Sequence, residues 1–248
     1  MNYLIGDIGN TYIKLSVLND NLKMEKIYNI ETNKILNKNY KNNFFRRFNR
    51  RTYKKNILFS SVVPKAFKKI KDILTKKSFK VFEIKNLKIK KILKIKIKNY
   101  NQLGSDRISN ALGSLNYKNT IVIDFGTATT FDIIEKGTYE GGVISPGVNL
   151  SISNLNNSTA LLPLLKLKNS QNSYGKNTHE ALNAGFIWGY QGLINNIIKK
   201  ISSKRKINYK IILTGGYAKL FKKHIRYKTI IDQNITIKGI IKAYKELL

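Results

Sequence analysis

Two segments of the chain have the hydrophobic pattern of a strand, a polar turn and a returning strand. In the first, the β-rich residues 3–8 end in the turn Asp7-Ile8-Gly9-Asn10. Residues 11–18 then alternate apolar and polar positions. In the second, residues 120–134, an apolar run leads into Asp124-Phe125-Gly126-Thr127 and apolar residues follow again. Each segment therefore predicts a β-hairpin with an aspartate at its turn.

The two hairpins indicate an internal repeat. Asp7 aligns with Asp124 and Gly9 with Gly126, and the two aspartates are 117 residues apart (124 − 7), close to half of the 248 residues. We therefore predict two related halves, with an N-terminal domain at residues 1–116 and a C-terminal domain at residues 117–248.

Further elements follow from the same patterns. Residues 57–63 predict a buried strand closed by Pro64, and residues 65–75 a helix. Residues 81–84 predict a strand, and Ser105 is expected to cap a helix whose apolar face includes Leu115. In the second half we predict a turn-rich link at 141–147, one long or two consecutive helices at 178–199, and a strand at 211–213 that leads into Gly215-Gly216.

The charge balance changes this picture less than its size suggests. The chain has 46 Lys and Arg against 14 Asp and Glu, a net charge of +32, which first favours a polyanionic partner such as nucleic acid. However, the lysines are scattered among Ile and Asn, as in residues 85–98, which is the result expected of AT-rich codons. We interpret most of the excess as solvated surface.

Several classes of function are excluded by composition. The chain has no cysteine and two histidines, so disulfides, a cysteine nucleophile and thiolate metal sites are excluded, and a zinc site is not expected. The N-terminus lacks a basic leader with an apolar core, and no apolar run reaches the ~18 residues of a membrane span. We expect a cytoplasmic protein.

The glycine-containing turns suit phosphate binding. ATP with Mg²⁺ requires backbone amides at close range, hydroxyl donors, and carboxylates that hold the metal directly or through water. Asp7-Ile8-Gly9-Asn10-Thr11 and Asp124-Phe125-Gly126-Thr127 provide these groups, and Gly215-Gly216 provides a third loop after a late strand. For either turn alone, an ordinary hairpin is the alternative.

The segment Gly104-Ser105-Asp106-Arg107 adds the groups that a kinase needs at its acceptor. Asp106 can accept a hydroxyl proton, and the planar guanidinium of Arg107 can bind a carboxylate. The alternative for Asp106 is a helix N-terminal charge that the helix dipole stabilises.

The three loops resemble those of the actin, hexokinase and acetate kinase superfamily, and the order of the motifs resembles the type III pantothenate kinases. The matching motifs extend over residues 7–218. They are Asp7-Ile8-Gly9-Asn10-Thr11, Ser60-Ser61-Val62-Val63-Pro64, Gly104-Ser105-Asp106-Arg107, residues 124–130, residues 141–147, Leu162-Pro163, Gly175-Lys176-Asn177-Thr178 and Thr214-Gly215-Gly216.

The resemblance implies an α/β fold of two related actin-like ATPase (ribonuclease H-like) domains, with the active site in the cleft between them. It implies ATP-dependent phosphorylation of pantothenate, with Asp106 as the proton acceptor and Asp124 as the ligand of a monovalent cation, K⁺ or NH₄⁺. It also implies a homodimer. The implied pantothenate-binding residues are Gly104, Ser105, Asp106, Arg107 and Thr178, and the implied ATP-binding residues are Asp7, Ile8, Gly9, Asn10, Thr11, Tyr12, Ile13, Lys14 and Thr127.

The sequence departs from the family pattern at one place, and two alternative functions are compatible with it. The family pattern places an aromatic residue and an Asn-Pro pair before the acceptor segment, whereas this chain has Ile97, Asn99 and Tyr100, so Tyr100 is assigned as the substrate-side aromatic. The alternatives are a kinase of the same superfamily that acts on another small alcohol, and a non-catalytic basic protein that binds nucleic acid or regulates. The second is not favoured, because three of only fourteen acidic residues, Asp7, Asp106 and Asp124, stand in these loops.

Overall fold

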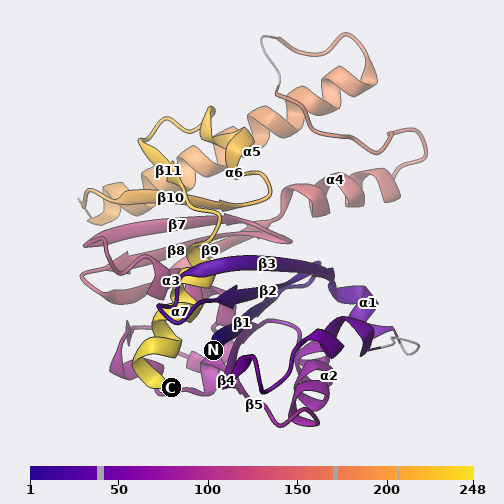
Figure 1. Cartoon of the computed structure of the whole chain (residues 1–248). Helices are drawn as coiled ribbons and strands as arrows, with labels where there is room; N and C mark the ends of the chain where they lie inside the picture. The colour runs from indigo at the N-terminus through magenta and orange to yellow at the C-terminus, as the bar shows by residue number, and fades with distance from the viewer. Residues whose placement is uncertain (38–41, 170–172, 206) are drawn as a thin grey trace. The chain divides into compact units, whose positions relative to one another are not determined.

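The computed structural model describes residues 1–37, 42–169, 173–205 and 207–248 (Figure 1). The chain forms two compact units. The first comprises Met1–Asn116, Gly137–Glu140 and Asn234–Leu248, and the second Tyr117–Lys136 and Gly141–Gln233. The division into domains 1–116 and 117–248 stays a prediction, because a compact unit need not be a segment that folds alone.

The first unit is built on a five-stranded sheet of order β3-β2-β1-β4-β5. The central strand β1 pairs antiparallel with β2 and parallel with β4, and β4 pairs parallel with β5. The strands are β1 (Asn2–Ile8), β2 (Tyr12–Leu18), β3 (Met24–Glu31), β4 (Tyr53–Ser61) and β5 (Lys80–Glu83).

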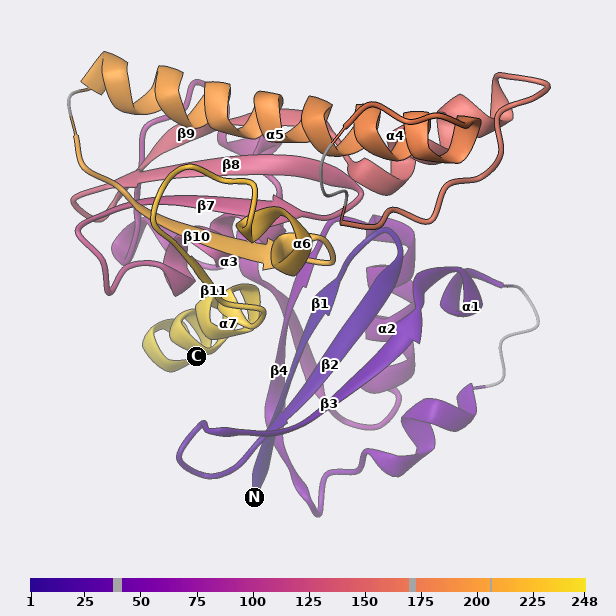
Figure 2. The ribbon, with the colours of Figure 1, turned by 90° about the horizontal axis from the view of Figure 1, so that it is seen from above.

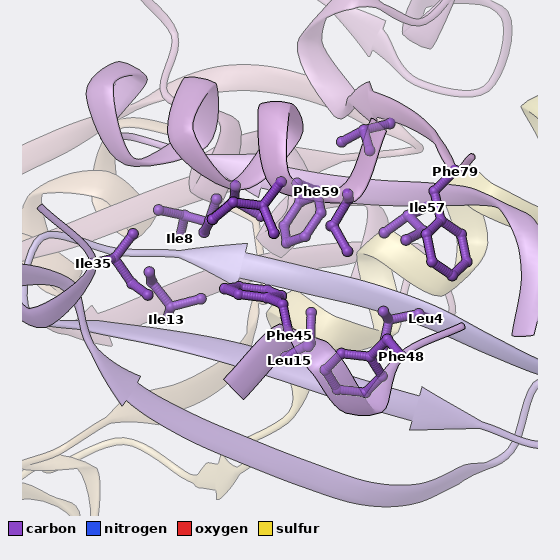
Figure 3. Packing of buried hydrophobic residues seen from close by; sticks show 14 of the residues in the cluster. Leu4, Ile8, Ile13, Leu15, Ile35, Phe45, Phe48, Ile57, Phe59 and Phe79 are labelled. Carbon is purple, nitrogen blue, oxygen red and sulfur yellow. The ribbon is translucent and has the colours of Figure 1, made fainter. Parts of the chain in front are cut away.

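Strand alternation sorts the side chains of β1 between two covered faces. Leu4 and Ile8 belong to a buried cluster with residues of β2, β4 and α2 (Pro64–Thr75), part of which Figure 3 shows. Tyr3, on the opposite face, contacts the ring of Tyr244 in α7 (Ile235–Leu247) at 5.3 Å between centroids. Asp7 has the same strand parity as Tyr3, so its side chain leaves the sheet on the face that α7 covers.

Two helices on that face pack closely against each other. They are α7 and α3 (Ser105–Gly113). A Cβ atom on Gly239 would lie 1.8 Å from the Ser109 carbonyl oxygen, and one on Gly113 would lie 2.2 Å from the Ile235 carbonyl oxygen. Glycine at both positions therefore permits the backbones of α3 and α7 to touch. The remaining helical elements of this unit are α1 (Thr32–Leu36), η1 (Asn42–Arg47), η2 (Ile84–Asn86), η3 (Ile89–Lys91) and η4 (Tyr100–Gln102).

The second unit repeats the strand topology of the first. β7 pairs antiparallel with β8 and parallel with β10, and β10 pairs parallel with β11. Its strand order, β11-β10-β7-β8-β9, corresponds to β5-β4-β1-β2-β3. The repeat predicted from the two hairpins is thus confirmed at the level of topology. The strands are β7 (Asn119–Phe125), β8 (Ala128–Glu135), β9 (Thr138–Pro146), whose first residues belong to the first unit and pair with β6 (Lys94–Ile95), β10 (Lys210–Gly215) and β11 (Thr229–Ile231).

Three helices cover one face of this sheet: α4 (Val148–Asn157), α5 (Thr178–Arg205) and α6 (Ala218–Lys222). Figure 2 shows α5 running along the strands of the second unit. Ile187, Ile194 and Ile198 of α5 are buried in one cluster with Ile121 of β7 and Leu213 of β10. Because these positions of α5 recur at intervals of three to four residues or multiples of them, one helical face supplies the core.

Five predictions of local structure need correction or refinement. Leu115 lies outside α3, which ends at Gly113 with Ser114 as its C-cap. Residues 141–146 are the second part of β9, so the link that we predicted there is a strand. Residues 178–199 lie in one helix, which excludes the two-helix alternative. Ile84 begins η2 and does not end β5. Ser105 is the first helical residue of α3, the N-cap is Gly104, and the Ser105 hydroxyl bonds elsewhere.

Among the described residues, none of the helices combines the length and the apolarity that crossing a bilayer requires.

Candidate active site

The first predicted phosphate loop connects β1 to β2. The Gly9 N–H donates to the Tyr12 carbonyl oxygen at 3.0 Å, and the Thr32 hydroxyl donates to the Gly9 carbonyl oxygen at 2.7 Å. Asn10 and Thr11 are exposed at the tip, whereas Asp7 is half-buried and pairs in register with Lys14. The loop is therefore held on both sides while its tip stays accessible.

The other predicted members of this loop differ in exposure. Ile8 and Ile13 are buried in the core cluster, so only their backbone groups can reach a ligand. Tyr12 is 53% exposed. Lys14 is half-buried in β2 opposite Asp7.

The acceptor segment lies at the start of α3 and is linked to the first loop through Val62. The Val62 N–H donates to the Ile8 carbonyl oxygen at 3.0 Å. A Cβ atom on Gly104 would lie 3.7 Å from Val62 Cγ1 and 2.4 Å from Asp106 Oδ1. The structure thus brings Gly104 and Asp106 close to the end of β1, and the Asp106 carboxylate folds over Gly104, where a side chain would displace it.

Burial alters the proton affinity of Asp106. Its Oδ1 accepts the N–H of Arg107 at 2.8 Å. Desolvation raises the pKa of this carboxyl, and the Arg107 N–H and guanidinium charge oppose that rise only in part. A carboxylate whose pKa is raised toward the working pH is a better proton acceptor than an ordinary exposed aspartate.

Two aromatic rings border this segment. The Arg107 guanidinium lies over the ring of buried Tyr139, 5.9 Å from its centroid, within the range of a cation–π contact. The Tyr100 hydroxyl donates to the Lys85 carbonyl oxygen at 3.2 Å, and Lys90 lies 5.7 Å from the Tyr100 ring. Tyr139 was missed from the sequence because nothing in the local pattern relates β9 to α3.

The second predicted phosphate loop connects β7 to β8 and lies beside the Gly215-Gly216 loop. The Gly216 N–H donates to the Phe125 carbonyl oxygen at 3.1 Å. Gly215 has φ +84°, and a Cβ atom there would lie 2.7 Å from Asp124 Oδ1. A left-handed backbone with no space for a side chain explains the glycine. The structure thus brings together Asp124, Gly215 and Gly216.

Thr127, in the same loop, lies against the start of α4. A Cβ atom on Gly147, the N-cap of α4, would lie 2.0 Å from the Thr127 carbonyl oxygen. Gly147 therefore allows the phosphate loop to rest directly on the α4 backbone.

Thr178, the predicted substrate contact in the second unit, is exposed at the first residue of α5. The capping bond at this end comes from its neighbour, because Asn177 Oδ1 accepts the Glu180 N–H at 3.0 Å. Glu180 in turn accepts the Lys176 N–H at 2.9 Å. A helix cap therefore does not require the Thr178 hydroxyl.

Glu83 is a second polar residue that the sequence reasoning missed. Its carboxylate accepts the Ser105 hydroxyl at 2.5 Å and the Lys85 N–H at 2.8 Å. Glu83, Gly104 and Ser105 line a cavity of about 400 Å³ with Phe67 and Leu103. The scarcity of acidic residues was a signal that could have identified Glu83, since an acidic residue at a strand end in so basic a chain is unexpected.

Oxygen ligands are available for metal ions in both loops, although no group of three or more His, Asp or Glu side chains gathers in the part of the chain that the structure describes. Beside Asp7, the buried Ser60 hydroxyl has no hydrogen-bond partner. Beside Asp124, the Phe125 carbonyl oxygen also approaches Gly215, because a Cβ atom there would lie 2.6 Å from it. Hydroxyl, carboxylate and carbonyl oxygens suit Mg²⁺ and other hard cations.

The repeated topology and the two aspartate-bearing hairpins define a protein of the actin-like ATPase fold class. Solved structures share this fold. A Baf family protein from Campylobacter jejuni has a TM-score of 0.63 at 20% identity and covers 98% of both chains. The ethanolamine utilization protein EutJ from Carboxydothermus hydrogenoformans has a TM-score of 0.56 at 13% identity, covering 98% of this chain and 89% of its own.

Sequence comparison identifies the family. The profile described as "Type III pantothenate kinase" matches residues 3–200. A relative from Pelagibacter ubique (strain HTCC1062) with the same description is 45% identical over 252 aligned positions, which cover 97% of each chain. The chain belongs to the type III pantothenate kinase family and is a phosphotransferase.

Proposed function

We propose that this protein transfers the γ-phosphoryl group of ATP to the primary hydroxyl of pantothenate, which yields 4′-phosphopantothenate in the first step of coenzyme A biosynthesis. Family membership supports the substrate and the reaction. The observation that supports the assignment of the base is the half-buried Asp106 carboxylate, oriented by the Arg107 N–H and with its pKa raised by burial.

Asp106 acts as the general base in this proposal. Its free carboxylate oxygen accepts the proton of the acceptor hydroxyl as that oxygen attacks the γ-phosphorus, and the bond to the ADP oxygen breaks. Because the transition state of phosphoryl transfer is mostly stabilised by alignment and charge neutralisation, the base contributes by positioning the hydroxyl as much as by removing the proton.

Arg107 binds the carboxylate of pantothenate. Its guanidinium is planar and permanently charged, so it can form two parallel hydrogen bonds to a carboxylate. The Tyr139 ring lies within cation–π range of the guanidinium and favours this orientation. Gly104, Ser105, Tyr100 and Thr178 complete the proposed acceptor contacts.

The two glycine-containing turns hold ATP in this proposal. The first, residues 7–14, provides exposed amides and hydroxyls at Asn10 and Thr11, and the second provides Thr127. Asp7 would hold Mg²⁺, with the unpartnered Ser60 hydroxyl close in register, and Asp124 would hold K⁺ or NH₄⁺. Bound cations would neutralise the charge that develops on the phosphate oxygens.

A coupled assay of ATP consumption tests the function. We expect turnover with pantothenate, loss of most of it when K⁺ and NH₄⁺ are both replaced by a large organic cation, and little turnover with sugars or with the alcohol analogue of pantothenate that lacks the carboxylate. Preference for an uncharged alcohol would contradict the role of Arg107 and favour a kinase of another acceptor. Turnover that is independent of the cation would remove the role of Asp124.

We also propose that the protein is a homodimer. Of the twelve exposed large hydrophobic side chains in the described ranges, seven fall between residues 144 and 188: Ile144, Leu150, Leu155, Leu161, Leu164, Tyr174 and Trp188. Leu161 is 91% exposed. They fall within one stretch of the chain, and exposed apolar side chains in such number are typical of a protein that buries part of its surface against another subunit. Sedimentation of the purified chain at the mass of a monomer would contradict this proposal.

A further inference from the structure

Glu83 uses both of its carboxylate oxygens in separate contacts. Oε2 accepts the N–H of Lys85 at 2.8 Å, and Oε1 accepts the hydroxyl of Ser105 at 2.5 Å. Glu83 is the last residue of β5 and pairs in register with Phe59 of β4. Its carboxylate therefore connects the sheet of the first unit to the first residue of α3.

The contact with Lys85 explains only half of this arrangement. Glu83 is the N-cap of η2, and a cap of that short helix needs one oxygen to accept the Lys85 N–H. The other oxygen bonds a side chain 22 residues further along the chain. A capping role thus gives no reason for the second contact.

The contact with Ser105 fixes the position of the residue beside the proposed base. Ser105 is 3% exposed, and its single hydroxyl proton is donated to Glu83, which leaves one rotamer of its side chain. The next residue is Asp106, whose Oδ1 would lie 2.4 Å from a Cβ atom on Gly104. Asp106 therefore folds back over Gly104 in the first turn of α3, the turn that Ser105 anchors, so a rotation of this turn would move the Asp106 carboxylate.

The Glu83 carboxylate is partly buried and accepts several hydrogen bonds. Burial raises the pKa of Glu83, and the hydrogen bonds from Ser105 and from the backbone of Lys85 and Ser61 oppose that rise. Ser61 ends β4, the strand that precedes Val62 and the link to the first phosphate loop. Three chain segments therefore meet at one carboxylate.

We propose that Glu83 is a positioning residue for phosphoryl transfer: through the Ser105 hydroxyl it holds the first turn of α3, and with it the Asp106 carboxylate, at the end of β5. This inference rests on the proposed function of Asp106. Glu83 acts through Ser105 and takes no proton from the substrate.

The test is a double-mutant cycle with Glu83→Gln and Ser105→Ala. Glutamine has one carbonyl oxygen. We expect it to accept the Lys85 N–H that caps η2, so the amide NH2 group faces Ser105 and the Ser105 hydroxyl loses its acceptor. We expect each single variant to lower kcat about tenfold, and the double variant to lose about tenfold as well, because both substitutions break the same contact. The KM for ATP should change by less than about twofold, since the phosphate loops are not altered.

A pH profile separates positioning from simple destabilisation. In Glu83→Gln the acidic limb of kcat, which reports the ionisation of Asp106, is expected to shift, whereas a smaller folded fraction would lower kcat without moving the limb. Ser114→Ala is the matched control: Ser114 is also a buried serine, at the other end of α3, and its hydroxyl donates to the Ala111 carbonyl oxygen. Its kcat should stay close to that of the unaltered protein.

The possible outcomes distinguish this inference from the proposed function. The positioning role of Glu83 would be overturned if the double variant lost about as much kcat as the product of the two single losses, or if the acidic limb did not shift. In either case Asp106 would remain the base. Full activity of Asp106→Asn would overturn the proposed role of Asp106 as the base, on which this inference rests. If Ser105→Ala does not fold, normal kcat and pH dependence of Glu83→Gln would still be sufficient to reject the inference.

Discussion

Asp106→Asn is expected to lower kcat by about 10² or more, in line with the loss of a general base, while ATP still binds. Asparagine has nearly the same shape, and its amide oxygen can still accept the Arg107 N–H, so the first turn of α3 should keep its geometry. The measurements are steady-state kinetics with pantothenate and a thermal-shift titration with ATP.

Asp72→Asn is the matched control, because it makes the same chemical change at an exposed position of α2. Its kcat should remain unchanged. Near-normal turnover of Asp106→Asn, with unchanged KM for pantothenate, would show that another group takes the proton.

Asp106→Asn is also expected to change the thermal stability of the protein, and the burial of Asp106 determines the direction of the change. Because the pKa of Asp106 is raised in the folded protein, its ionised form is destabilising there; this cost develops as pH rises through the unfolded pKa and is complete above the folded pKa. Asp106→Asn should therefore raise Tm at neutral pH and have little effect at strongly acidic pH.

For the unaltered protein, kcat should fall on acidification at a pH above the usual range of aspartate.

Gly147→Ala is expected to raise the KM for ATP by at least about tenfold and to lower kcat, because displacing a binding loop by ~1 Å can cost up to about 10². The new methyl group would lie 2.0 Å from the Thr127 carbonyl oxygen and 2.7 Å from the Gly126 carbonyl oxygen. Both oxygens belong to backbone, so the second phosphate loop or the start of α4 must move.

Gly185→Ala controls for the loss of a glycine. Gly185 lies within α5, and a Cβ atom there would have nothing within 4 Å. Replacing it should stabilise the protein by about 0.5–1 kcal/mol, since alanine favours the helix. An unchanged KM for ATP in a folded Gly147→Ala variant, with circular dichroism like that of the unaltered protein, would contradict a role of this loop in binding phosphate.

The hydrophobic pattern was sufficient to predict the two hairpins and their repetition. Alternation along β1, β2, β7 and β8 is a local property, and turns that contain Asp and Gly are determined by a few neighbouring residues. The long helix α5 and the strand β10 were predicted for the same reason. By contrast, β3 and α6 were not interpreted, because their short or lysine-interrupted segments carry weak periodicity. The helix α7 was also not interpreted, although its buried Ile237, Ile240 and Tyr244 recur at helical spacing.

The sequence by itself therefore determined the class of fold and the residue types of the candidate site, since both depend on spacing along the chain. Only the tertiary structure decided which residues distant in the sequence contact the residues of the candidate site. Ser105 illustrates the difference: its position before an apolar helical pattern predicted a cap, yet its hydroxyl bonds Glu83, 22 residues earlier. Tyr139 under Arg107 and Gly147 against Thr127 are contacts of the same kind, because hydrogen bonds and packing across a fold depend on chain topology, which no local pattern encodes.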